Sequence, residues 1–176
     1  TKEASFNFDK FRRHVAAAMR MMDDIIDLEL EKVEAILEKI SKDPEDEDIR
    51  QVEVKLWEKI REKALQGRRT GLGITAEGDM LAALGLRYGT DEATDFAVEI
   101  QKTLAVEAYR TSVKMAQERG KFPIYDAGRE EGNPMIERIK EADPALYEEM
   151  VKHGRRNIAM LTIAPTGTTS LMSQAT

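Results

Sequence analysis

Apolar residues in the first forty positions recur at steps of three and four, which is the spacing of one face of an α-helix. The series is Phe11, Val15, Met19, Met22, Ile26, Leu30, Val33, Leu37 and Ile40. The pattern predicts one long amphipathic helix over Phe11–Ile40. We expect this helix to end at Ser41–Asp48, where a proline and a run of acidic residues interrupt the spacing.

The same periodicity predicts most of the remaining chain as helix. The expected helices are Ile49–Gln66, Met80–Leu84, Asp91–Arg119, Met135–Ala142 and Pro144–His153. Thr75 and Thr90 (or Asp91) are candidate N-caps, because hydroxyl and carboxylate side chains accept hydrogen bonds from free helix N–H groups. Gly67 and Gly120 are candidate C-terminal residues.

Two short segments have a different pattern. Arg69–Ile74 carries two glycines and little charge, and Asn157–Pro165 is an apolar run that ends at a proline. We interpret Arg69–Ile74 as a short strand or a tight connection, and Asn157–Pro165 as a buried strand. Two strands alone cannot form a stable sheet, so we expect them to pair with strands outside this chain.

The predicted fold is therefore mostly α with a few short strands. It forms one partial domain over 1–176, with a helical part at 1–67 and a glycine-containing segment at 68–89. A second helical part spans 90–156, and a strand and loop span 157–176. The chain begins at Thr1 and stops within an expected helix at Thr176, so we expect a piece of a longer protein.

Composition narrows the function classes. The 176 residues carry a net charge of -6, which disfavours a nucleic-acid partner. No apolar run reaches the roughly 20 residues of a membrane span, so no membrane partner is expected. The chain has no cysteine, which removes disulfides and thiol chemistry from anything it does alone and is compatible with a cytoplasmic protein.

The loop after the second predicted strand is a candidate phosphate-binding site. A strand, a glycine-containing turn and a helix start bring free backbone N–H groups and the positive end of the helix dipole together. The candidate residues are Pro165, Thr166, Gly167, Thr168, Thr169 and Ser170. The loop lacks the Gly-Lys-Ser/Thr sequence of a Walker A motif. On spacing alone, a plain helix-capping turn is the favoured alternative.

Other candidates favour structural roles. Gly71-x-Gly73 resembles part of a dinucleotide fingerprint, but Ala76 stands at the third glycine position and no second strand ends in an acid about twenty residues on. We therefore favour close backbone packing under a helix there. Arg68 and Arg69 are typical of contacts to carboxylates or to a helix C-terminus.

The acids Asp23, Asp24, Asp27, Glu29 and Glu31 suggest either a metal site or a solvated helix face. No Glu-x-x-His pattern accompanies them, so we favour the solvated face and predict no metal. Neither His14 nor His153 lies within a catalytic motif, and we assign no catalytic residue.

Three stretches in order resemble the large, catalytic subunits of ribonucleotide reductases. ASFNFDKFRRHVAAAMRMMDDIID (4–27) resembles the helix that enters this region of the family's barrel. GRRTGLGITAEGDMLAALGLRYGT (67–90) resembles the segment after the central active-site strand. NIAMLTIAPTGTTSLMSQAT (157–176) resembles a later strand and loop. The Thr-Gly-Thr sequence of 166–168 is closer to the adenosylcobalamin-dependent class than to the di-iron class.

The resemblance implies a fragment of a ten-stranded α/β barrel that reduces ribonucleotides to 2′-deoxyribonucleotides by thiyl-radical chemistry. It implies that Pro165–Ser170 binds the phosphates of a ribonucleoside di- or triphosphate. It also implies adenosylcobalamin in the full-length enzyme, none on this chain alone, and the rest of the catalytic subunit as a partner.

The chain departs from the family in one respect that matters for catalysis. Without cysteine it has neither the radical cysteine nor the reducing pair, so we expect no activity from the chain alone. Exposed strand edges would favour self-association as a homo-oligomer. The alternative hypothesis is a non-catalytic helical interaction module, which the long amphipathic helices would equally suit.

Overall fold

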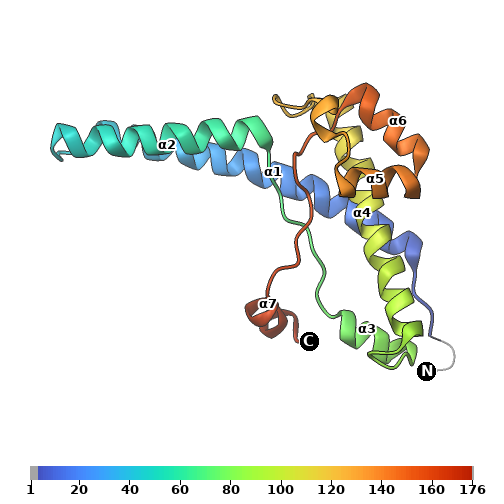
Figure 1. Cartoon of the computed structure of the whole chain (residues 1–176). Coiled ribbons are helices and arrows are strands. Elements are labelled where there is room, and N and C mark those ends of the chain that lie inside the picture. The colour runs from blue at the N-terminus through green and yellow to red at the C-terminus, as the bar shows by residue number, and fades with distance from the viewer. Residues whose placement is uncertain (1–3, 176) are drawn as a thin grey trace.

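The computed structural model describes residues 4–175 as a helical protein (Figure 1). Its helices are α1 (Phe8–Ser41), α2 (Glu47–Gly67), α3 (Glu77–Leu84), α4 (Asp91–Arg119), α5 (Pro134–Ala142), α6 (Pro144–His153) and α7 (Gly167–Ser173), with a 3-10 turn at Ala127–Glu130. The helices expected from periodicity are all present, with ends that shift by up to three residues. The predicted helix at the end of the chain is α7, and Thr176 lies outside the described residues.

Side-chain caps explain several of these helix starts. Asn7 accepts a hydrogen bond from the Lys10 N–H at the start of α1, and Thr90 accepts one from Ala93 at the start of α4. Thr75 is not the cap of α3, because the helix begins at Glu77 and its N-cap position is Ala76, which has a left-handed φ of 69°. Gly67 is the last residue of α2 rather than its cap, and the left-handed residue is Arg68.

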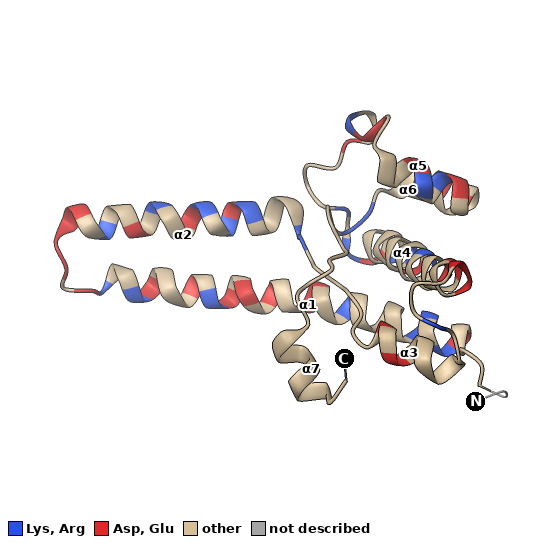
Figure 2. Ribbon diagram, turned by 60° about the horizontal axis from the view of Figure 1, so that its bottom comes forward, with Lys and Arg blue, Asp and Glu red and all other residues tan. Residues whose placement is uncertain are grey.

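Helix α1 is shared between two layers. Figure 1 shows its second half paired with α2 in a long hairpin that projects from the molecule, while its first half crosses α4. Val33 and Ile40 are buried in the hairpin, and Val15 and Met19 are buried where α1 meets α4. Charged residues line both arms of the hairpin along its length (Figure 2).

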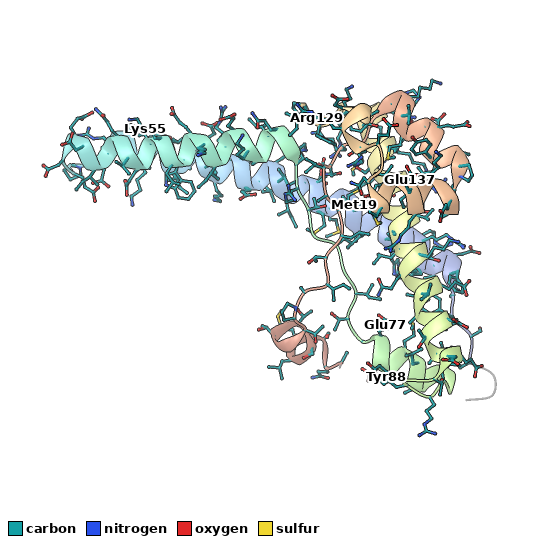
Figure 3. All side chains as sticks on the ribbon, in the orientation of Figure 1. Met19, Lys55, Glu77, Tyr88, Arg129 and Glu137 are labelled. Atoms are coloured by element: carbon teal, nitrogen blue, oxygen red, sulfur yellow. The ribbon has the colours of Figure 1, made fainter. Side chains whose placement is uncertain are left out.

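The main core lies where α1, α4, α5 and α6 meet. Its fully buried side chains include Met19, Met115, Ile139, Met150 and Met160. Met19 lies at this junction in Figure 3. Methionines fill much of this core, since the unbranched thioether adapts to irregular space. None of the helices in the described part of the chain is both long and apolar enough to cross a bilayer.

The prediction of short strands within an α/β barrel is wrong for residues 4–175. The two segments interpreted as strands form one isolated parallel bridge between Leu72 and Leu161, and no named strand or barrel is present among the described residues. Within residues 4–175 they pair with each other along one edge, and one pair of extended segments is too few to build a sheet.

Candidate functional site

The loop Pro165–Ser170 leads into helix α7. The helix begins at Gly167, and Thr166 precedes it without a capping hydrogen bond from its side chain. Pro165 to Thr169 are exposed, and Ser170 is half-buried. The Ser170 N–H donates to the Thr166 carbonyl at 2.6 Å, and its hydroxyl donates to the Gly167 carbonyl at 2.9 Å. The predicted site residues therefore lie together at a helix start.

Open space surrounds the glycine of this loop. A Cβ built on Gly167 would have no atom within 4 Å outside its chain neighbours and its own helix. Figure 2 shows α7 free of charged residues, in contrast to the hairpin. Backbone N–H groups and hydroxyls are therefore the polar groups that this loop offers from its own residues.

Two extended segments run side by side toward the loop. Ile158 N–H donates to the Gly67 carbonyl at 2.9 Å, and Thr70 N–H donates to the Ala159 carbonyl at 2.9 Å. The Leu72 N–H donates to the Met160 carbonyl at 2.7 Å, and the Thr162 N–H donates to the Leu72 carbonyl at 3.0 Å. These bonds hold residues 158–162 parallel to 67–72, and the loop begins three residues beyond the last of them.

Gly73 permits the closest approach between the two segments. A Cβ at this position would lie 2.6 Å from the Thr162 carbonyl oxygen, a distance that real Cβ contacts do not reach. A Cβ at Gly71 would lie 3.2 Å from Thr162 Cγ2. The Gly-x-Gly sequence is therefore explained by close backbone packing, as favoured from the sequence, although the neighbour is an extended segment and not a helix.

A buried polar cluster lies at the start of both segments. Asp23, with no exposed surface, is its centre. Arg68 donates to Asp23 twice: Nε to Oδ1 at 2.8 Å and Nη2 to the carbonyl at 3.0 Å. Arg119 and Arg156 reach the second carboxylate oxygen, Oδ2, at 3.4 and 3.3 Å. We call Asp23, Arg68, Arg119, Arg156, Ser112 and Asn157 the Asp23 cluster.

Within the Asp23 cluster, Asn157 forms hydrogen bonds to residues from three separate parts of the fold. Its side-chain Nδ2 donates to Asp23 Oδ1 at 2.9 Å and to the Arg68 carbonyl at 3.0 Å. Its Oδ1 accepts from the Ser112 hydroxyl of α4 at 2.9 Å, and its own N–H donates to the same hydroxyl at 3.1 Å. Asn157 is completely buried, and both of its amide donors are used.

The charges of the cluster determine the protonation of its acid. Burial of Asp23 raises its pKa, but the Arg68 hydrogen bond and charge, the Asn157 hydrogen bond and the Arg156 charge outweigh burial, so the pKa lies below its usual value. Burial lowers the Arg68 pKa, and its bonds to Asp23 and Asp27 more than reverse this. The cluster therefore holds an ionised carboxylate among cationic arginines.

The solvated-face interpretation of the acids is wrong for Asp23 and holds only in part for its neighbours. Asp24 and Asp27 have side chains that are about half exposed, but Asp24 binds Arg119 and Asp27 binds Arg68, each at 2.7 Å. Carboxylate oxygens of the three acids lie within 4.8 Å of one another. Arginines already neutralise these charges, so we assign the acids to ion pairs and not to a metal. The expectation that Arg68 contacts carboxylates is confirmed.

Sequence reasoning missed Ser112 and Asn157. Both are buried polar residues beside apolar neighbours, Ser112 within α4 and Asn157 at the start of an apolar run. A polar residue at an otherwise core-facing position is the signal that could have identified them, because buried polar groups require hydrogen-bond partners. Their partners come from residues far away in the sequence and could not be inferred from spacing.

A groove of about 960 Å³ lies between α4, α5 and the extended segment 161–163. Much of its wall is aliphatic, including Ala97, Leu104, Met135, Ile139, Leu161 and Ile163. Glu77 and Gln101 lie at its polar side and are joined by a hydrogen bond of 2.9 Å. Neither His14 nor His153 lines it, and the His153 Nε2 lies 3.5 Å from Glu149 on the same helix.

Together, the fold and the loop define a helix-rich module in which two parallel extended segments lead to the start of a helix. The whole chain, residues 1–176, matches the family model described as "Ribonucleotide reductase, barrel domain". The chain belongs to this family.

The relatives of the chain are named as reductases of two kinds. It is 27% identical over 97% of its length to a vitamin B12-dependent ribonucleoside-diphosphate reductase of Mycobacterium tuberculosis, covering 18% of that protein. It is 28% identical over 95% of its length to one of Thermoplasma acidophilum, covering 16%. It is 25% identical over 92% of its length to a ribonucleoside-diphosphate reductase subunit alpha of Chlamydia pneumoniae, covering 15%. The chain thus spans less than a fifth of each of these relatives.

Proposed function

We propose that this chain is the part of a ribonucleoside-diphosphate reductase that holds the substrate's phosphates. Membership of the reductase family supports the reaction class. The observation that carries the assignment to Pro165–Ser170 is an exposed helix start, with open space at Gly167, at the end of the paired extended segments.

The loop binds phosphate through its backbone in this proposal. The first N–H groups of α7 have no acceptor within the helix, and the positive end of the helix dipole favours an anion there. Gly167 lets phosphate oxygens approach these N–H groups without meeting a side chain. The hydroxyls of Thr166, Thr168 and Thr169 supply further donors. The loop positions the substrate and carries out no proton or electron transfer itself.

The reducing chemistry is assigned to the rest of the subunit. The chain contains no cysteine, so the thiols of a thiyl-radical reaction come from other residues, and the chain alone is predicted to be inactive. Two of the relatives are named as vitamin B12-dependent, which favours adenosylcobalamin as the radical source of the whole enzyme. The groove of about 960 Å³ has a mainly aliphatic wall and is lined by neither histidine, so we assign the cofactor to the rest of the subunit.

An NMR titration of the chain with inorganic pyrophosphate tests the loop. We expect amide shifts confined to Gly167–Ser170. Replacing Gly167 with Val should weaken binding about tenfold or more, which corresponds to about 1.4 kcal/mol. The fold should tolerate this change, since Gly167 has open space and no positive φ.

Ala164→Val is the matched control, because it adds the same kind of bulk to an exposed residue just before the loop. It should leave the affinity for pyrophosphate nearly unchanged. A chain whose loop amides do not shift with pyrophosphate would refute the phosphate-binding role and favour the interaction-module hypothesis.

A further inference from the structure

The position of the loop depends on the register of the two extended segments that lead to it. A slip of one residue would move segment 158–162 by about 3.3 Å along its partner and reverse which side chains face the core. The loop begins only three residues after Thr162, the last residue held by this pairing. A register error would therefore carry the N–H groups of α7 away from their place.

Two features of the structure can set this register. At the far end, Gly73 lies so close to the Thr162 carbonyl oxygen that a Cβ would come within 2.6 Å of it, so a non-glycine residue cannot take its place opposite Thr162. At the near end, Asn157 is bound both to the Arg68 carbonyl and to Asp23. Between these two ends the segments are joined by backbone hydrogen bonds and the Thr70 hydroxyl contacts, which by themselves specify no particular register, while Met160 is buried in the core and Arg155 binds the Ile158 carbonyl.

At the near end, several contacts fix the position of Asn157 opposite Arg68. Arg68 has φ 44°, a left-handed conformation that costs a non-glycine residue free energy. Its side chain is held in place by Asp23 and Asp27, and its carbonyl is the acceptor for Asn157. Ser112 binds the other end of the same amide, so α4 also fixes the position of Asn157.

We propose that Asn157 is a positioning residue for the loop Pro165–Ser170: its buried amide fixes residue 157 opposite Arg68 and thereby sets where α7 presents its N–H groups. The residue lies well before the loop in the chain and acts through the paired segments without touching the ligand. This inference rests on the proposed phosphate-binding function of the loop.

The test is Asn157→Ala in the full chain, measured in two ways. Amide hydrogen exchange at Leu72 and Thr162, the two N–H groups at the far end of the pairing, should become faster. The dissociation constant for inorganic pyrophosphate, read from the Gly167–Ser170 amides, should rise about tenfold. Residual binding should saturate at the same loop amides, since the loop's own groups are unchanged.

Arg110→Gln is the matched control. It removes the 2.5 Å contact between Arg110 and Asp143, which joins α4 to the start of α6 without touching either extended segment. Its pyrophosphate affinity should match that of the native chain even if its melting temperature falls. A general loss of stability would instead weaken binding equally in both variants, and that result would overturn the proposal.

Ser112→Ala is the milder second variant, to be used if Asn157→Ala does not fold. It removes the hydroxyl that binds Asn157 but leaves the Asp23 and Arg68 bonds, so both effects should be present and smaller. Faster exchange with unchanged pyrophosphate affinity in a folded variant would overturn the positioning role alone. If the native chain does not bind pyrophosphate, the proposed phosphate-binding function is refuted, and so is the positioning role of Asn157 that rests on it.

Discussion

Asp23 is a charged residue from which water is excluded, and three arginines make this possible. Its side chain is bound by Arg68, Arg119 and Arg156, and the amide of Asn157 completes the set. Removing one partner of a buried ion pair is costly because the remaining charges lose their compensation. Asp23 is thus the residue whose replacement should affect stability most directly.

Asp23→Asn should lower the free energy of unfolding at pH 7 by about 3–5 kcal/mol, the usual cost of breaking a buried ion pair. Urea unfolding followed by circular dichroism measures it. Asp24→Asn is the control on the adjacent residue: its side chain is 56% exposed and binds Arg119 alone, and exposed pairs contribute at most about 1 kcal/mol. Equal losses in the two variants would contradict the central role of Asp23.

The same carboxylate predicts a pH dependence. Because the folded state lowers the pKa of Asp23, its stabilising contribution is complete above the unfolded value of about 4 and is lost as the pH falls through the folded value. The melting temperature of the native chain should therefore fall in acid. Glu118 and Asp143, whose pKa values are also lowered, add to this fall. In the Asp23→Asn variant, the melting temperature should fall less steeply as the pH drops below 5. An equally steep fall would contradict the assignment of this pH dependence to Asp23.

At the scale of elements, the helices could be predicted and the strands could not. Helices α4 and α6 have the boundaries expected from the sequence, because periodicity, caps and helix-ending residues lie within the helices or next to them. The segments around Leu72 and Leu161 are extended as expected. Whether an extended segment becomes a strand depends on partners elsewhere in the fold, and within the part of the chain that the structure describes each of these two segments pairs with the other.

Gly73→Ala tests the close approach of the two extended segments. The added Cβ would meet the Thr162 carbonyl oxygen at 2.6 Å, so the backbones must separate. We expect a loss of about 1–3 kcal/mol, as for other overpacked sites, in urea unfolding. Gly71→Ala is the control, since its Cβ would meet a side-chain methyl at 3.2 Å and should cost less. A larger loss at Gly71 would contradict this packing.

At the scale of the whole molecule, the apolar surface around the loop is notable. Ile163, Leu171 and Met172 are 93%, 81% and 84% exposed, and Figure 1 shows α7 standing apart from the helical body. Large exposed apolar side chains that lie near one another in a chain mark contact surfaces. In the proposed function, the rest of the catalytic subunit covers them.

The isolated chain is therefore expected to self-associate through this surface. Sedimentation velocity should show a mass that rises with concentration, and the double variant Leu171→Glu, Met172→Glu should reduce it. Met21→Glu is the control, since Met21 is an exposed apolar residue that belongs to α1 and not to α7. If Met21→Glu reduces association as strongly as the double variant, the contact surface lies elsewhere.

The sequence by itself determined the helices, the glycine-rich close packing, the helix start at the loop and the resemblance to reductases, because each of these depends on residues near one another in the chain. The tertiary structure decided the rest. It buried Asp23 among arginines from three distant segments, placed Ser112 and Asn157 beside it, and paired residues 158–162 with 67–72. Burial and hydrogen-bond partners depend on which distant elements meet, and spacing along one chain does not contain that information.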